Sequence, residues 1–383
     1  MSCHRQASHP LLKLIPPTTT VTVNVIILSR CQRLIPPLSP NLHKGQAGRI
    51  AVVGGSKDYS GAPFFASMTT LRLFRNHTQD IVKTYSPDLI VHTDLVEDSY
   101  VTSERRDGNE TNPSSPTRFH PVFAIHRTEE SLTNLFESLL PRLHVLVIGP
   151  GLGRSEHMQL AARTAISLAR EKGLFIIIDA DGLWLVQTDP DVIKGYPKAV
   201  LTPNVVEFKR LCKAVNIDTD NDSSSDPSKL AGRLATALGG VTILEKGAVD
   251  RIANDEKEEA WTNETQGSLR RCGGQGDVLS GAVGCFLAWG LSYVQRQEGG
   301  EEGGDKSDPI TETEIPRLAA YAASTITRTA SRLTFEKKKR AMQTSDMLGF
   351  VGDAFEEVFP EMVVEQQTEG SEEREGKKIR SKV

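Results

Sequence analysis

The sequence predicts an α/β fold in which a mainly parallel sheet is covered by helices on both faces. Apolar, β-branched runs recur along the chain, and segments with apolar residues at helical spacing follow most of them. The runs are almost continuously apolar, which is typical of strands buried on both faces. Glycine-rich turns follow several of these runs where a strand gives way to a helix. Together these observations indicate a three-layer α/β/α arrangement.

The elements can be followed in order from about residue 49. RIAVVGGS (49–56) is predicted as a strand, and SGAPFFASMTTLRLF after it as a helix. A strand at 144–153 is followed by a helix at 155–173, further strand–helix units lie at 174–186 and 199–212, and 239–254 adds a buried strand with a polar turn. The last part, from GDVLSGAVGCFLAWGL to LAAYAASTITRTASRLTF, is predicted as small-residue helices separated by a polar loop.

Three regions follow from this pattern. Residues 34–358 form the predicted domain, and residues 359–383 are charged, lack apolar anchors and are expected to be a disordered tail. Residues 1–33 are an unassigned extension. The chain has no acidic residue before Asp58, as in organellar transit peptides. The extension is nevertheless interrupted by prolines and lacks a convincing basic amphipathic helix, so a loose extension is favoured and mitochondrial import stays open.

Composition excludes several classes of protein. The 383 residues carry a net charge of -4, which provides no basic field for nucleic acid. The cysteines number 5 and include neither a C-x-x-C pair nor a Cys/His cluster, so a reducing, cytoplasmic setting without a zinc site is expected. No apolar run approaches the roughly 18 to 20 residues that span a bilayer. A soluble protein is predicted, and its anionic ligands would need a local site.

The stretch RRCGGQGDVLSG (270–281) is the first candidate for such a site. Its glycines allow positive φ angles and close approach of a ligand, and a helix that starts near Asp277 presents unpaired N–H donors. Such a helix start binds phosphate. Asp277 would then serve as a general base that takes a proton from an attacking hydroxyl. A glycine-rich turn with an N-cap aspartate explains the stretch equally well.

Other polar residues follow predicted strands. GPGLGR (149–154) and GGS (54–56) lie between a strand and a helix, where ligands bind in open α/β sheets, although either could be a tight turn. Asp179 and Asp181 are alternate residues at a strand end, expected on one side, where they could orient substrate hydroxyls or a hydrated Mg²⁺. A helix-capping role is the alternative for these aspartates.

Two further motifs have a structural and a functional interpretation. Asn204 and Glu207 have the spacing of a capping box, with a further polar use open. Lys246 and Asp250 flank a glycine-containing turn, which is either a surface hairpin or a nucleotide contact.

Taken in order, KGQAGRIAVVGGSKDYSGAPFFAS, LVIGPGLGR, IIDADGLWLV, LTPNVVEFKRL, EKGAVD and GSLRRCGGQGDVLSG resemble the ATP-dependent (S)-NAD(P)H-hydrate dehydratases of the ribokinase-like superfamily. The resemblance covers residues 34 to 358. It implies repair of the hydrated nicotinamide cofactors NADHX and NADPHX with consumption of ATP and with Mg²⁺ accompanying the nucleotide. The hydroxyl on the reduced ring would be phosphorylated, and phosphate would then leave. An NAD(P)HX epimerase is the implied functional partner, and a homo-oligomer is left open.

The resemblance also implies site residues, carried over where the motifs match. Asp277 would act at the reacting hydroxyl, and the amides of Gly274 to Asp277, Gly276 included, would form the anion hole. The implied hydrate-binding residues are Gly151, Gly153, Asn204, Val205, Val206, Glu207, Phe208, Lys209, Arg210 and Asp277. The implied ATP-binding residues are Lys246, Gly247, Ala248, Val249, Asp250, Gly267, Ser268, Leu269, Arg270, Arg271, Cys272, Gly273, Gly274, Gln275 and Gly276.

One departure from the family pattern leaves alternatives open. After Phe74 the family continues with a glycine-led segment and a further strand, whereas RNHTQD follows here. Losing a strand would expose unpaired backbone groups, so a catalytically inactive nucleotide-binding protein is one alternative. The other is a kinase of the same superfamily that phosphorylates a vitamin precursor. HKGQAGRI and NVVEFKR favour the dehydratase over that kinase.

Overall fold

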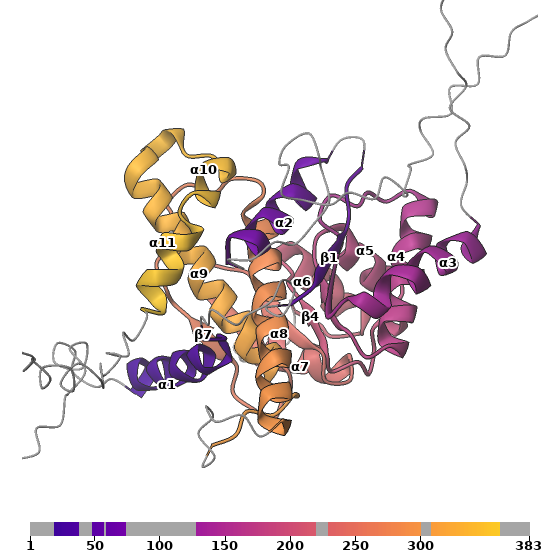
Figure 1. Ribbon diagram of the computed structural model, residues 1–383, viewed down its shortest axis with the longest axis horizontal. Coiled ribbons are helices and arrows are strands. Elements are labelled where there is room, and N and C mark those ends of the chain that lie inside the picture. Colours follow the sequence, from indigo (N-terminus) through magenta and orange to yellow (C-terminus); the bar gives the residue numbers. More distant parts are fainter. Residues whose placement is uncertain are drawn as a thin grey trace, which may run out of the picture.

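In the part of the chain that the structure describes, a seven-stranded sheet forms the centre of the protein (Figure 1). The computed structural model describes residues 19–37, 48–56, 59–73, 128–219, 229–299 and 308–360. The strands lie side by side in the order of the chain; β1 to β5 run parallel, and β6 and β7 are antiparallel to their neighbours. Their bounds are β1 Ile50–Val53, β2 Val145–Ile148, β3 Phe175–Ile178, β4 Ala199–Leu201, β5 Thr242–Glu245, β6 Asp250–Ala253 and β7 Trp261–Asn263.

Helices cover both faces of this sheet, and two separate cores result. Successive strand residues point to opposite faces, so Val145 and Val147 of β2 enter one core while Leu146 and Ile148 enter the other. The first core includes residues of α1 Thr19–Leu34, α2 Gly61–Leu73, α8 Gln275–Glu298, α9 Ile315–Lys338, α10 Thr344–Leu348 and α11 Val351–Val358. The second includes residues of α3 Glu129–Leu139, α4 Glu156–Glu171, α5 Asp181–Thr188, α6 Val205–Ala214 and α7 Leu230–Ala237. The predicted three-layer α/β/α fold is confirmed.

Helix α8 is the central element of the first core. A Cβ on Gly281 would lie 2.1 Å from the carbonyl oxygen of Ala66, so α2 and α8 pack backbone against backbone. The Thr70 hydroxyl donates to the Gly281 carbonyl at this contact (3.2 Å). Within the described ranges, α8 is long and apolar enough to cross a membrane, a property that the sequence analysis did not identify. Its apolar window is 78% buried in the protein, as expected of a core helix.

The expectation of a loose N-terminal extension is wrong for residues 19–33. With Leu34 these residues form α1, whose side chains Ile27, Cys31 and Leu34 are buried against α8 and α9. The helix was missed because β-branched residues and flanking prolines weaken its sequence signal, whereas packing stabilises it. Phe359 is likewise buried against Phe286, one residue beyond the predicted end of the domain. The tail beyond residue 360 lies outside the described residues.

The predicted loss of a strand after Phe74 falls on residues 74–127, which also lie outside the described residues. In the described sheet β1 is an outer strand that pairs with β2. The inactive alternative, which depends on that segment, therefore stays a prediction.

Candidate active site

Loops that follow the parallel strands meet at one edge of the sheet, and the N-terminus of α8 reaches the same edge. Asp179 directly follows β3 and Lys246 directly follows β5. A Cβ on Gly276, in the first turn of α8, would lie 3.3 Å from Lys246 Nζ and 3.7 Å from Asp179 Oδ2. The geometry therefore brings the glycine-rich stretch to the carboxyl edge of the sheet, where open α/β folds bind their ligands.

The start of α8 has the backbone geometry of an anion site. Gly274 is its N-cap residue and has a φ angle of 95°, in the left-handed region. The first hydrogen bond of the helix runs from Val278 N to the Gly274 carbonyl oxygen (3.1 Å). The N–H groups of Gln275, Gly276 and Asp277 therefore lack a helical partner and present the positive end of the helix dipole.

A charged pair lies beside this helix start. Lys246 Nζ is 2.8 Å from Asp179 Oδ1, and the Asp179 side chain is only 2% exposed. Burial alone would lower the pKa of Lys246, but the carboxylates of Asp179 and Glu207 outweigh it and raise that pKa. Lys246 is therefore a permanent cation at the edge where an anionic ligand would bind.

Asp277 has the environment of a general base. Its burial, reinforced by the negative charge of Asp179 and opposed by Lys246, raises the pKa of Asp277 to about 7. A carboxylate with this pKa accepts a proton more readily than an ordinary aspartate and is ionised in part of the population at neutral pH. The first turn of α8 thus carries a proton acceptor next to unpaired N–H donors.

The predicted capping box at the start of α6 is confirmed. Asn204 Oδ1 accepts from Glu207 N (3.0 Å), and Glu207 Oε2 accepts from Asn204 N (2.8 Å). Burial raises the pKa of Glu207 against the opposing charge of Lys246. The residues of the implied hydrate-binding run differ in exposure. Val205 and Val206 are exposed, whereas the Phe208 side chain is buried in the second core.

Lys209 and Arg210, also in the implied hydrate-binding run, are exposed on α6. Among the implied nucleotide-binding residues, Val249 and Gly267 are half-buried and Leu269 is exposed, in the loops on either side of β6 and β7.

The two aspartates after β3 make separate contacts. Asp179 binds Lys246, whereas Asp181 is the first residue of α5 and accepts from Gly153 N and Arg154 Nε, both at 3.0 Å. Asp181 therefore holds the glycine-rich loop after β2, whereas Asp179 faces the start of α8. The two side chains bind different partners because α5 begins between them, and their use in ligand binding stays a prediction.

The glycine-rich loops after β1 and β2 lie against each other. Gly55 N donates to the Pro150 carbonyl oxygen (3.1 Å), and a Cβ on Gly54 would lie 2.1 Å from that oxygen. Gly151 has a φ angle of 61°, and a Cβ there would lie 2.3 Å from the Tyr59 carbonyl oxygen. These positions are thus restricted to glycine by backbone contact, which is the tight-turn interpretation, while Gly153 contributes its N–H to Asp181.

The predicted hairpin at Lys246–Asp250 is confirmed by the antiparallel pairing of β5 and β6. Asp250 is buried, accepts from Gly247 N (2.9 Å) and Ser324 Oγ (2.7 Å), and forms an ion pair with Arg328 (2.6 Å). Asp250 therefore anchors the turn, and a direct contact of its side chain with a nucleotide stays a prediction.

Arg328 of α9 was missed by the sequence analysis. Its guanidinium donates to the carbonyl oxygens of Gly247 (2.9 Å), Ala248 (3.1 Å) and Thr265 (3.2 Å) as well as to Asp250. Arg328 thus joins the β5–β6 turn to the loop after β7. The sequence marks this position only by an arginine in a helical stretch of mostly small and apolar residues. No local motif accompanies it.

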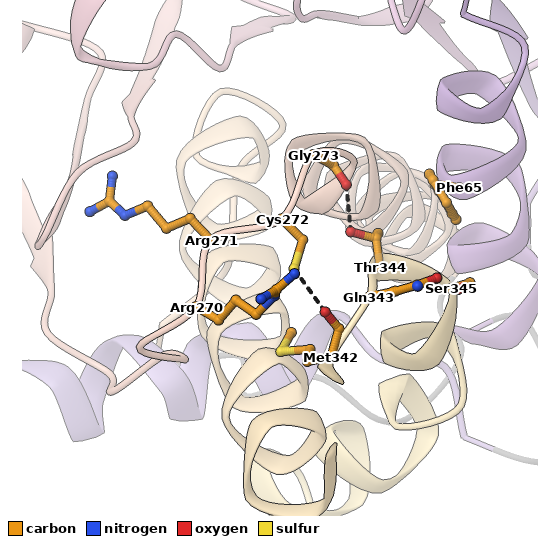
Figure 2. A pocket seen from close by; sticks show the side chains of 9 residues that line it. All are labelled: Phe65, Arg270, Arg271, Cys272, Gly273, Met342, Gln343, Thr344 and Ser345. Atoms are coloured by element: carbon orange, nitrogen blue, oxygen red, sulfur yellow. Dashed lines mark hydrogen bonds between the residues drawn. The ribbon is translucent and has the colours of Figure 1, made fainter. Parts of the chain in front are cut away.

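The stretch before α8 is fixed by two sets of contacts. On one side Ser331 Oγ donates to Ser268 Oγ (2.7 Å) and Gln275 Nε2 donates to Ser331 Oγ (3.2 Å). On the other side Cys272 Sγ donates to the Met342 carbonyl oxygen (3.3 Å). On that second side lies an open hollow of about 420 Å³, lined by Phe65, Arg270, Arg271, Cys272, Gly273, Met342, Gln343, Thr344 and Ser345 (Figure 2).

The carboxylates at the site suit a metal ion whose coordination shell is completed mostly by the phosphates of a bound nucleotide and by water. In the part of the chain that the structure describes, no group of three or more His, Cys, Asp or Glu side chains could enclose a metal. Mg²⁺ in nucleotide sites needs only one or two carboxylates, because phosphate oxygens and waters complete its shell. Asp179 is the buried carboxylate beside the α8 N-terminus and fits that demand, with Glu207 as the second acidic group near Lys246.

Comparisons with known proteins point to one family. A family model described as NAD(P)H-hydrate dehydratase matches residues 50–350. The chain is 46% identical over 339 residues to ATP-dependent (S)-NAD(P)H-hydrate dehydratase 1 of Puccinia graminis f. sp. tritici, covering 86% of this chain and 78% of that protein. It is 44% identical to the ATP-dependent (S)-NAD(P)H-hydrate dehydratase of Mycosarcoma maydis, covering 89% of this chain and 91% of that protein.

A solved structure supports the fold. A ribokinase-like superfamily protein from Enterococcus faecalis superposes with a TM-score of 0.59 and covers 86% of this chain and 94% of that chain. The identity is 19%, so the likeness concerns the arrangement of the layers.

Proposed function

The chain belongs to the NAD(P)H-hydrate dehydratase family, and we propose that it dehydrates the S epimer of NADHX and NADPHX at the expense of ATP. The products are NADH or NADPH, ADP and phosphate. The observation that carries this proposal is Asp277, a carboxylate with a pKa near 7 in the first turn of a helix whose N–H groups lack partners. One helical turn thus offers a base for a hydroxyl and donors for a phosphoryl group.

The first step is phosphoryl transfer. Asp277 takes the proton from the hydroxyl of the hydrated nicotinamide ring, and the oxygen attacks the γ-phosphorus of ATP while ADP leaves. The N–H groups of Gly274 to Asp277 donate to the oxygens of the transferring group, where negative charge develops. Lys246 adds a positive charge at the same edge of the sheet.

The second step is elimination. The C–O bond to the phosphorylated hydroxyl breaks, phosphate leaves with the bonding electrons, and a proton is lost from the neighbouring ring carbon. The ring double bond is restored, so the hydroxyl oxygen departs with the phosphate. Transfer to the hydroxyl makes this possible because phosphate is a far better leaving group than hydroxide. The same donors that stabilise the transferring group suit the departing phosphate.

Mg²⁺ is proposed to accompany ATP, with Asp179 and Glu207 as the protein groups that would hold it. Bound Mg²⁺ neutralises phosphate charge. The proposed nucleotide contacts are the β5–β6 turn, clamped by Arg328, and the stretch 267–276. The proposed hydrate contacts are the loop with Gly151 and Gly153 and the start of α6. A cytoplasmic setting is also proposed, from the sequence pattern of the cysteines.

The proposal extends to a functional partner. Because only the S epimer would be consumed, an epimerase that interconverts the two epimers would be needed for complete repair. A homo-oligomer and mitochondrial import also remain proposals.

The test is direct. Purified protein is supplied with ATP, Mg²⁺ and chemically prepared NADHX, and recovery of reduced-nicotinamide absorbance is followed together with ADP release. One ADP per NADH formed is expected, and Asp277→Asn should bind ATP normally but lose turnover by more than about 100-fold. A folded wild-type protein that gives no recovery would contradict the proposal. Phosphorylation of a thiazole or pyrimidine alcohol instead would identify a kinase of the same fold.

A further inference from the structure

The proposed anion hole begins at a peptide bond between two glycines, Gly273 and Gly274. Two adjacent glycines can adopt either orientation of the peptide plane between them at little conformational cost. A Cβ on Gly273 would meet no atom within 4 Å, whereas one on Gly274 would lie 2.8 Å from Phe65 and 3.0 Å from Thr344 Cγ2. The Gly273 side of the peptide is therefore the less crowded one, and the hydrogen bond of its carbonyl is the contact that can set the direction of the Gly274 N–H group.

Thr344 supplies that contact from a distant part of the chain. Its Oγ1 donates to the Gly273 carbonyl oxygen at 2.5 Å, and the residue is 3% exposed (Figure 2). In a trans peptide the carbonyl and the following N–H point in opposite directions. Holding the Gly273 carbonyl toward Thr344 therefore turns the Gly274 N–H away from α10.

The segment that carries Thr344 is itself fixed. Met342 is fully buried, and its carbonyl accepts from Cys272 Sγ (3.3 Å). The segment from Met342 to Thr344 is therefore bonded to two successive residues before α8, Cys272 and Gly273. A capping box between Gln343 and Asp346 closes the start of α10, with Gln343 N donating to Asp346 Oδ2 (2.9 Å). Thr344 is thus held by groups on both sides of it.

We propose that Thr344 is a positioning residue whose hydroxyl locks the Gly273–Gly274 peptide so that the Gly274 N–H faces the transferring phosphoryl group. This rests on the proposed function. Without the hydroxyl the peptide can flip, which removes one donor and places a carbonyl oxygen where negative charge develops. Losing one donor of this kind lowers kcat by roughly 100- to 1,000-fold. Because a fraction of the peptides keeps the productive orientation, we expect a decrease of about 10- to 100-fold.

The experiment compares Thr344→Val, which keeps the shape and removes the hydroxyl, with Thr344→Ser, which keeps the hydroxyl. Thr344→Val should lower kcat by about 10- to 100-fold while KM for ATP changes less than about threefold, since ground-state binding uses other contacts. Thr344→Ser should restore most of kcat. Equal losses in both variants would overturn the proposal, as would a normal kcat in Thr344→Val.

The matched control is Thr70→Val. Thr70 is also a buried threonine whose hydroxyl bonds to a backbone carbonyl of the α8 region, that of Gly281, but away from the anion hole. It should lower the melting temperature without a selective loss of kcat. If Thr70→Val and Thr344→Val lower kcat equally, the role of Thr344 is structural and the proposal fails. Should Thr344→Val not fold, Thr344→Ala takes its place.

A binding measurement separates this proposal from the proposed function. Fluoroaluminate with ADP and Mg²⁺ occupies the place of a transferring phosphoryl group without any hydrate. Thr344→Val should bind this combination at least tenfold more weakly than the wild type while binding ADP alone equally well. Unchanged binding of the fluoroaluminate complex overturns the proposal. Failure of the proposed function would instead appear as a wild type that binds the complex but does not regenerate NADH.

Discussion

Asp277 is expected to destabilise the folded protein, and Asp277→Asn should therefore be more stable than the wild type. The raised pKa means that the folded state holds the proton of Asp277 more tightly than the unfolded state. Below a pH of about 4 the residue is protonated in both states and contributes nothing. As the pH rises from about 4 to about 7 the unfolded state ionises first, so the free energy of unfolding falls, and above about 7 the full penalty persists.

The size of this destabilisation follows from the rise in the pKa of Asp277. The pKa rises from 3.8 to about 7, and about 3 units at about 1.36 kcal/mol each give an upper bound of about 4 kcal/mol. Solvent reaches this half-buried side chain in part, so an effect of about 2 to 4 kcal/mol is expected. The α8 dipole favours a carboxylate here by only about 0.3 to 1 kcal/mol, which is too little to reverse the sign.

Urea unfolding of the wild type and Asp277→Asn from pH 4 to pH 8 measures this difference. The advantage of the variant should grow up to a pH of about 7 and then stay constant. Asp353→Asn is the matched control, because Asp353 also lies in the first turn of a helix, α11, but is exposed. That control should lose up to about 1 kcal/mol at all these pH values. A variant no more stable than the wild type at pH 8, or an advantage independent of pH, would refute the reasoning.

Three further predictions concern the same region. Lys246→Met removes the charge that lowers the pKa of Asp277, so the acid limb of the profile of kcat against pH should move to higher pH. An acid limb that stays in place or moves to lower pH contradicts this prediction. Arg328→Lys keeps the charge but loses the forked hydrogen bonds to the β5–β6 turn, so KM for ATP should rise about tenfold with a smaller change in kcat. A variant that loses only kcat would contradict the proposed role of this turn in nucleotide binding. Gly274→Ala forces a side chain into a φ of 95°, with Phe65 at 2.8 Å, and should lose about 1 to 3 kcal/mol of stability. Gly273→Ala has open space and should unfold at nearly the same denaturant concentration; equal losses would argue against the packing explanation.

Local sequence signals predicted the fold well. Parallel strands buried on both faces are long apolar runs, and the turns after them need glycine or a capping residue, so β2, β3 and the Asn204–Glu207 capping box were readable from a few neighbouring residues. The start of α8 at the glycine-rich stretch was predicted for the same reason. These features depend on interactions within about ten residues of the chain.

The residues that hold the site in place could not be predicted in this way. Arg328 and Thr344 act from α9 and α10 on loops more than 60 residues earlier in the chain, and no local pattern marks them. Asp179 and Asp181 were grouped because they are neighbours in sequence, yet the start of α5 separates their contacts. Phe208 lies within a matching motif, but the helical repeat turns its side chain into the core.

The position of α1 has a consequence for how the protein is made. Arg30 of α1 forms an ion pair with Glu314 at 2.8 Å, and Cys31 donates to the Leu318 carbonyl oxygen. These partners leave the ribosome 284 and 287 residues later than the residues they bind. During synthesis the apolar side chains of α1 therefore stay exposed to solvent until α9 has been synthesised. Contacts between such distant residues slow folding, so nascent chains of this protein should depend on chaperones until α9 is complete.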